Sequence, residues 1–115
     1  MKYIMGLCAG RHEIPVQDFI FDEIPDVTDF DAMAKAADAA IPRDADELEV
    51  YVTGLTPAML AVVNVCQGGK INLTALNYDE VSGQYIKQTV LVWRTCGFCG
   101  CRMHNRDPQC PSCGG

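Results

Sequence analysis

The chain has 115 residues, 49% of them hydrophobic, which suits one domain with a buried core plus a small appendage. Its net charge of −6 is unevenly spread. Residues 1–93 carry 14 acidic and 6 basic side chains, whereas residues 94–115 have a net charge of +2. Because neither part forms a strong basic patch, non-specific binding to a phosphate backbone is disfavoured.

Residues 2–8, KYIMGLC, form a nearly continuous apolar run that is typical of a strand covered on both faces. The run is too short for the apolar core of a signal peptide, and the charged sequence RHE follows at residues 11–13. No stretch approaches the ~20 apolar residues that cross a bilayer. We therefore expect a soluble, cytoplasmic protein whose cysteines are reduced or metal-bound rather than paired in disulfides.

Residues 9–27 lack clear periodicity and contain Pro15 and Pro25, so they predict a long loop of the kind that often serves as a lid over a functional site. A helix is predicted over residues 28–41, where apolar side chains recur at helical spacing. Thr28 is the expected N-cap, because Thr28 to Asp31 forms a capping-box-like T-x-x-D.

The middle of the chain predicts three more strands and a buried helix. Residues 47–54 alternate between apolar and polar, which indicates a strand. A helix with apolar residues on nearly every face follows over residues 56–67, with Thr56 as N-cap. Residues 71–79 and 84–93 predict two further strands joined by a short turn.

This order of elements predicts a three-layer α/β domain that resembles half of a Rossmann fold. Right-handed crossovers should make the first three strands parallel, and the fourth should run antiparallel beside the third. We expect two units: this α/β domain at residues 1–93, and a small metal-binding ribbon at residues 94–115.

The C-terminal cysteines form two copies of the turn C-x-x-C-G, in which two thiolates point toward one ion. The predicted ligands of a four-thiolate site are Cys96, Cys99, Cys110 and Cys113. Zinc is the expected metal of such a closed site, in a structural role. Cys101 and His104 lie between the two turns and are expected to stay outside the site. The competing interpretation is that these cysteines are free or form disulfides.

The segment VWRTCGFCG…CPSCGG also resembles the rubredoxin-like tail of rubrerythrins, which binds iron. The resemblance covers about the last 23 residues and implies iron-based electron transfer as a minor alternative. In rubrerythrins that module accompanies a di-iron helical bundle with Glu-x-x-His motifs. This chain has no such motif and only two histidines, so a structural zinc ribbon is preferred.

In parallel sheets, ligands bind beyond the carboxyl ends of the strands, and three predicted segments meet there. The candidate ligand-binding residues are Gly10, Thr53, Gly54, Thr56 and Tyr78, and the candidate catalytic residues are Arg11 and His12. Amides at the start of the second helix favour an anion. Arg11 could grip a phosphate, His12 could transfer protons, and Tyr78 could stack on a base.

Each of these residues also has a purely structural explanation. Thr56 is a natural helix cap, and Gly54 permits a tight turn. Arg11 and His12 fit an exposed loop, and Tyr78 fits a hairpin. The chain contains neither G-x-G-x-x-G nor a Walker A motif, so ordinary dinucleotide or nucleoside triphosphate binding is not indicated.

The segments GRHEIP and YVTGLTPAMLAVVNVC look like parts of small proteins borne by phages and mobile elements. They are similar in organisation to Rossmann-like CARF sensor domains and ring nucleases encoded near CRISPR loci. This similarity covers roughly residues 1–80 and implies binding of a cyclic oligoadenylate. It implies phosphate contacts or chemistry at five positions: Thr53, Gly54, Thr56, Arg11 and His12.

The favoured function is therefore binding of a nucleotide-like signal, cyclic or linear, by a homodimer. If the signal is cleaved, His12 would activate a ribose hydroxyl and Arg11 would stabilise the developing charge. The alternative is a non-catalytic interaction or anti-defence module that acts through the acidic body or the ribbon. Rubredoxin-like electron transfer is the third hypothesis. The sequence does not decide between binding and cleavage.

Overall fold

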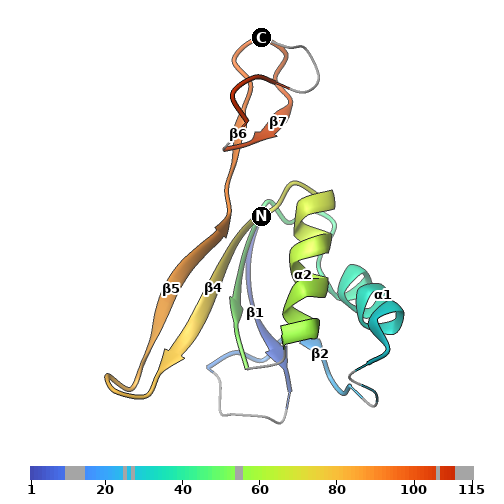
Figure 1. The fold of residues 1–115 in the computed structure, drawn as a ribbon, viewed down its shortest axis with the longest axis vertical. Coiled ribbons are helices and arrows are strands. Elements are labelled where there is room, and N and C mark those ends of the chain that lie inside the picture. The colour runs from blue at the N-terminus through green and yellow to red at the C-terminus, as the bar shows by residue number, and fades with distance from the viewer. Residues whose placement is uncertain (10–14, 25, 27, 54–55, 106, 111–115) are drawn as a thin grey trace.

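The computed structural model describes residues 1–9, 15–24, 26, 28–53, 56–105 and 107–110. Its main feature is a five-stranded sheet in the order β2-β1-β3-β4-β5 (Figure 1). The strands are β1 (Lys2–Cys8), β2 (Phe19–Phe21), β3 (Glu47–Tyr51), β4 (Asn72–Asp79) and β5 (Gln84–Leu91). The first four strands pair in parallel and β5 pairs antiparallel with β4. The predicted mixed sheet with an antiparallel last strand is thus confirmed.

The two helices, α1 (Phe30–Ala40) and α2 (Thr56–Gly68), pack against each other on one face of the sheet (Figure 1). The described part of the chain therefore has two layers, and the predicted three-layer arrangement is wrong. The reason lies in the strand order. The connections β2-α1-β3 and β3-α2-β4 cross the sheet in the same direction, so right-handed crossovers put both helices on the same side.

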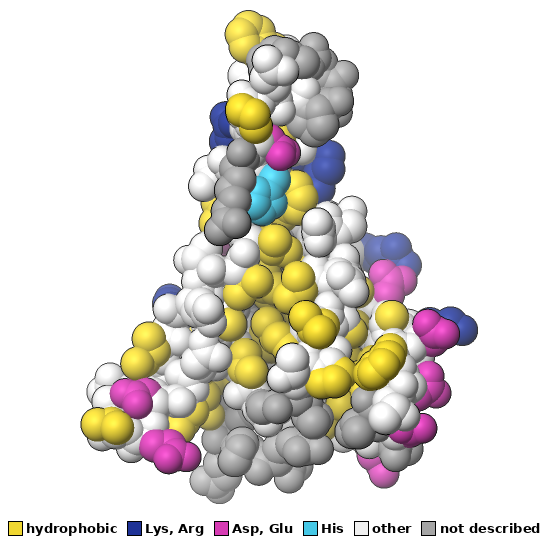
Figure 2. Space-filling model, in the orientation of Figure 1, with side chains coloured by type: hydrophobic (Ala, Val, Ile, Leu, Met, Phe, Trp, Pro, Cys, Tyr) yellow, Lys and Arg dark blue, Asp and Glu magenta, His cyan; other side chains and the backbone are white. Residues whose placement is uncertain are grey.

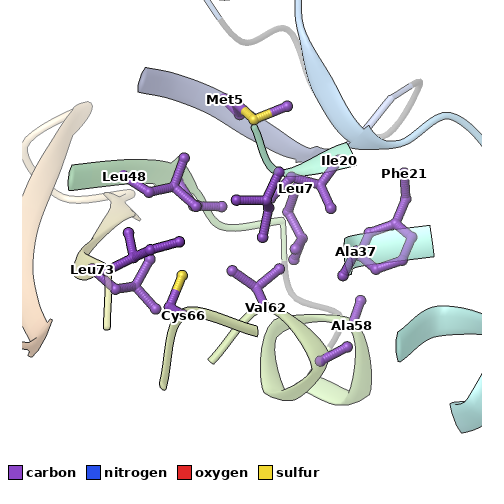
Figure 3. Close-up of a cluster of buried hydrophobic side chains, with 14 of the residues drawn as sticks. Met5, Leu7, Ile20, Phe21, Ala37, Leu48, Ala58, Val62, Cys66 and Leu73 are labelled. Atoms are coloured by element: carbon purple, nitrogen blue, oxygen red, sulfur yellow. The ribbon is translucent and has the colours of Figure 1, made fainter. Parts of the chain in front are cut away.

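The hydrophobic core lies between the sheet and this helical layer (Figure 3). Leu7, Leu48 and Leu73 from three strands are almost completely buried. Small side chains at the helix surfaces that face the core, such as Ala37 and Ala58, let the helices approach the sheet closely. Burial raises the pKa of the Cys66 thiol to about 12, so this cysteine stays neutral and acts as an apolar packing residue.

Helix α1 begins one residue later than the capping box predicts. Asp29 is the N-cap, and its carboxylate accepts a hydrogen bond from the amide of Ala32 at 3.1 Å. Thr28 instead donates its hydroxyl to Asp26 at 2.6 Å, so the expectation that Thr28 caps the helix is wrong. The helix ends at Ala40, because Ile41 takes an extended conformation before Pro42.

Strand β2 lies within the segment that the sequence predicts to be a loop. Its residues Phe19 and Phe21 pair with Gly6 and Cys8 of β1. A Cβ atom at Gly6 would lie 2.5 Å from the ring of Phe19, so the close approach of the two strands requires glycine there. The structure thus adds an edge strand where a lid was expected.

Residues after β5 form a separate two-stranded hairpin of β6 (Trp93–Thr95) and β7 (Arg102–His104), which we call the ribbon. The ribbon stands off one end of the sheet, at the amino-terminal ends of the parallel strands (Figure 1). Trp93 joins the ribbon to the sheet and its two helices, which we call the body. The indole Nε1–H donates to the carbonyl of Ile71 at 3.0 Å, and the backbone amide of Trp93 donates to Asn72 Oδ1 at 2.7 Å.

Neither α1 nor α2 is long and apolar enough to span a membrane.

Candidate metal centre and ligand site

The first C-x-x-C-G turn lies at the tip of the β6–β7 hairpin and has a tight backbone. The amide of Gly100 donates to the carbonyl of Cys96 at 3.0 Å, and the amide of Cys96 donates to the carbonyl of Cys101 at 2.8 Å. Gly100 has a φ of +76°, a conformation that L side chains rarely adopt. This turn holds the cysteines on both sides of Gly100 close together.

Three thiols from the two turns converge on one point. The Sγ atoms of Cys96, Cys99 and Cys110 all lie within 4.8 Å of one another. Two of these cysteines are almost fully buried, with exposed fractions of 5% for Cys96 and 1% for Cys110, whereas Cys99 is exposed. Such a set can hold a metal ion, as predicted. The fourth predicted ligand, Cys113, lies outside the described residues.

Cys101 lies among the thiols, contrary to the expectation that its strand leads it away. Its Sγ is 2.9 Å from Cys99 Sγ and 3.2 Å from Cys110 Sγ, while the Cys99 and Cys110 sulfurs are 3.5 Å apart. The turn at Gly100 directs the chain back toward the cluster, which spacing alone did not indicate. The sequence signal that could have found it is the count of five cysteines for four metal positions.

The apolar core of the ribbon is very small. Among the described residues it consists of Cys96, Met103 and Cys110, with Cys101 packed against them. Phe98, the largest apolar side chain in the first turn, is 86% exposed. A core of this size cannot stabilise a fold without a further cross-link, which is the usual situation of small metal-binding modules.

His104 lies at the base of the ribbon. Its ring stands edge to face against Trp93, with centroids 5.3 Å apart, and its backbone amide donates to Asp107 Oδ2 at 3.2 Å. The group of metal-binding side chains found in the described part of the ribbon contains no histidine.

Four residues of the predicted ligand and catalytic site, Gly10, Arg11, His12 and Gly54, lie outside the described residues. Thr53 lies two residues after the end of β3 in a buried position, with an exposed fraction of 7%. Its hydroxyl has no hydrogen-bond partner within the described structure. Thr56 is the first residue of α2 and is exposed.

Tyr78 and Thr56 belong to opposite faces of the sheet. Leu73 of β4 belongs to the core under the helices, so the alternation of side chains along the strand turns Tyr78, five residues later, to the other face. There its ring stands edge to face against Tyr85, with centroids 5.3 Å apart, and Tyr85 in turn contacts Tyr51 at 4.7 Å. The structure does not gather Tyr78 with the residues at the start of α2.

This tyrosine row and the ion pairs beside it were missed in the sequence. On the helix-free face, Glu49 Oε1 lies 3.3 Å from the ammonium groups of both Lys2 and Lys87. Alternation within β3 indicates which of its residues share a face of the sheet. The register that brings Tyr51 beside Tyr85 depends on pairing through β4 and has no local signal.

A groove of about 520 Å³ lies between the C-terminal parts of the two helices. Its wall includes Asp38, Ile41, Arg43, Asn64 and Val65. Because Gly68 and Gly69 at the end of α2 also line it, the groove is at the opposite end of that helix from Thr56. None of the predicted site residues that the structure describes lines it.

Comparisons with protein-family models, curated protein sequences and solved structures found no match.

Proposed function

We propose that the ribbon holds a structural zinc ion through Cys96, Cys99, Cys110 and Cys113. The observation that carries this proposal is the convergence of three thiols, from two turns ten residues apart in sequence, within 4.8 Å of one another. Zinc is preferred because a closed set of thiolates without an open position is characteristic of structural zinc sites. Four thiolates and one divalent cation carry a charge of −2, which offsets the +2 of residues 94–115.

Metal binding would supply the stability that the ribbon core lacks. Zinc binding at comparable sites is worth about 10–16 kcal/mol in isolated peptides, which is ample to order some twenty residues. In this proposal the ion fixes the hairpin tip, and Trp93 fixes the hairpin base to the sheet.

Elemental analysis of the purified full chain tests this proposal. We expect one zinc per chain, and loss of that zinc in Cys96→Ser and Cys110→Ser variants. Cys8→Ala, which removes a buried thiol of β1, is the matched control and should keep its zinc. Stoichiometric iron would overturn the assignment in favour of rubredoxin-like electron transfer, and a metal-free chain would overturn both.

For the body, we propose a second function: binding of a nucleotide-like anion at the carboxyl ends of β1 and β3. The supporting observation is Thr53, a buried hydroxyl with no partner in the described structure, three residues before α2 begins. The start of α2 offers free amides and partial positive charge to an anion. A bound phosphate oxygen would satisfy the Thr53 hydroxyl.

The remaining members of this ligand set are proposed from their sequence positions. Gly10 and Gly54 would allow close backbone approach, and Thr56 would add a hydroxyl donor. Arg11 would bind phosphate, and His12 would act as a base if the ligand is cleaved. Tyr78 is left out, because its ring lies on the other face of the sheet. A ligand site at the carboxyl ends of parallel strands would be Rossmann-like. In this proposal two subunits also form a dimer with two-fold symmetry, in which the strand ends of one subunit face those of the other.

Calorimetry with a panel of linear and cyclic nucleotides tests the second function. We expect one class of nucleotide, linear or cyclic, to bind the zinc-loaded protein. Thr56→Ala should weaken this binding. Product analysis for the wild type and His12→Ala separates binding from cleavage, and sedimentation with and without ligand reports the dimer. If a folded, zinc-loaded chain binds no nucleotide of the panel, this function is wrong.

The acidic surface over α1 supports a non-catalytic alternative. Exposed carboxylates gather on this side of the molecule (Figure 2), and they include Asp26, Asp29, Asp31 and Asp38. A basic partner could dock there. Binding of a lysine-rich peptide should then fall in an Asp31→Asn/Asp38→Asn variant and persist in Thr56→Ala and His12→Ala. The reverse pattern would exclude this alternative.

A further inference from the structure

The ribbon has more thiols than a closed zinc site can use. A tetrahedral zinc has four positions, and Zn–S bonds of about 2.3 Å put neighbouring sulfurs roughly 3.8 Å apart. The described structure places Cys101 Sγ 2.9 Å from Cys99 and 3.2 Å from Cys110, nearer than two sulfurs on one zinc. Cys101 is therefore within reach of the metal position without being one of the four ligands assigned above.

We propose that Cys101 is a reserve metal ligand that takes the place of Cys99. The proposal rests on the zinc centre proposed above. Cys99 is the one to be replaced, because its Sγ is nearer to Cys101 Sγ than that of Cys110 is and because it is exposed, whereas Cys96 and Cys110 are buried. Among the ribbon thiols that the structure describes, Cys99 is therefore the first that a reagent in solution reaches.

The backbone of the turn allows this exchange without rearrangement. Cys99 and Cys101 are the two neighbours of Gly100. The carbonyl of Cys101 accepts from the amide of Cys96, and the carbonyl of Cys96 accepts from the amide of Gly100. These bonds hold the backbone at residues 100 and 101 against Cys96 without using the Cys99 side chain. Only the side chains of Cys99 and Cys101 need to rotate.

The exchange balances in bonds and charge. The metal–sulfur bond to Cys99 breaks, and one to Cys101 forms. Cys101 loses its thiol proton to water as it becomes a ligand, and the released Cys99 thiolate takes up a proton from water. If Cys99 has been alkylated, the proton of Cys101 is released to solvent and Cys99 takes up none. Four thiolate ligands remain in either case, so the centre keeps its metal after damage to its exposed cysteine.

Zinc affinity of serine variants, measured by competition with a chelator, tests the proposal. We expect Cys101→Ser to bind like wild type and Cys99→Ser to stay within about tenfold of it. Cys96→Ser and the double variant Cys99→Ser/Cys101→Ser should lose about a hundredfold or more. The double variant keeps only three thiols in the ribbon, and in Cys96→Ser the reserve ligand Cys101 replaces Cys99 and not Cys96, so one ligand position lacks a thiolate in each variant. Cobalt substitution gives a second readout, because its absorption reports four thiolates in Cys99→Ser and three in the double variant.

Limited alkylation with iodoacetamide, followed by native mass spectrometry, tests the same exchange in the unmutated chain. Wild-type protein with one modified cysteine should retain one zinc, whereas singly modified Cys101→Ser should lose it. The proposal is overturned if wild type binds zinc and Cys99→Ser loses as much affinity as the double variant. If wild type binds no metal, the zinc centre itself is wrong.

Discussion

Thr53 is the one buried polar side chain in the described core that has no hydrogen-bond partner there. A hydroxyl removed from water without a partner costs about 1–3 kcal/mol, a cost that usually persists only where the group has a use. Thr53 lies two residues after β3 and three residues before α2 begins, where a bound anion could supply the missing acceptor.

Replacing Thr53 with valine separates the effect of its hydroxyl on stability from its effect on ligand binding. Thr53→Val keeps the shape of the side chain and removes the unsatisfied hydroxyl, so we expect the free energy of unfolding to rise by about 1 kcal/mol without ligand. Nucleotide binding should weaken in the same variant. Urea denaturation and calorimetry measure the two effects. Destabilisation by Thr53→Val would show that the hydroxyl already has a partner in the native protein.

Glu49 is a nearly buried carboxylate on the helix-free face of the sheet. Its side chain is 13% exposed and lies 3.3 Å from both Lys2 and Lys87. Burial acts to raise the pKa of Glu49, but hydrogen bonds from Lys87 and Lys2 outweigh it, so the pKa is lowered. The two lysines are largely exposed, and this limits the stabilisation to about 1 kcal/mol.

A carboxylate with a lowered pKa stabilises the fold above its unfolded-state pKa, and this contribution is lost as pH falls through the folded-state pKa. Glu49→Gln should therefore destabilise the protein at about pH 7, and the difference from wild type should shrink below about pH 4. Urea denaturation at both pH values measures this. Glu47→Gln, at an exposed position of the same strand, is the control and should change stability little at pH 7. If Glu49→Gln lowers the free energy of unfolding equally at both pH values, the ion pairs do not explain the stabilisation by Glu49.

At the scale of elements, the pairing of β2 with β1 depends on the close approach of the Phe19 ring to Gly6. Gly6 of β1 leaves room for the ring of Phe19, which would otherwise lie 2.5 Å from a Cβ atom. Gly6→Ala should therefore destabilise the protein by about 1–3 kcal/mol through overpacking. Gly68→Ala is the matched control: its Cβ meets nothing within 4 Å at the end of α2, so it should be neutral or slightly stabilising. Thermal denaturation compares the unfolding temperatures of the two variants. If Gly6→Ala and Gly68→Ala change the unfolding temperature equally, tight pairing of β2 with β1 is wrong.

Most elements could be predicted because their signals are local. The apolar run in β1, the alternation in β3 and the apolar length of α2 each identified an element within a few residues of its observed bounds. Strand β2 could not be predicted, because three residues between two prolines carry no periodicity and its pairing depends on a distant glycine. The helix layer was misassigned because the strand order that puts both helices on one face is not a local property.

The candidate sites were predictable to different degrees for the same reason. The repeated C-x-x-C-G turn carries its own geometry, so the convergence of Cys96, Cys99 and Cys110 followed from sequence. Cys101 was misplaced because the backbone at Gly100, with its positive φ, decides its direction. Tyr78 was grouped with Thr56 because both were expected near the carboxyl ends of the strands, but side chains that share an edge of a sheet can still point to opposite faces.

At the scale of the whole molecule, the ribbon and the start of α2 lie at opposite ends of the sheet (Figure 1). The body has a large core of its own, whereas the described core of the ribbon contains only three buried residues. We therefore propose that a metal ion folds the ribbon and that the body folds without it. Trp93, the only tryptophan, lies at their junction and contacts His104 across the hairpin.

Chelator titration of the full chain tests this claim most directly, followed together by Trp93 fluorescence and far-UV circular dichroism. As zinc is removed, Trp93 emission should shift toward that of an exposed indole, because the pairing of β6 with β7 is lost, while the circular dichroism and unfolding temperature of the body change little. Added zinc should restore the emission, and Cys110→Ser should show the shifted emission without chelator. Unchanged Trp93 emission after complete zinc removal, or unfolding of the whole chain with the metal, would contradict the account.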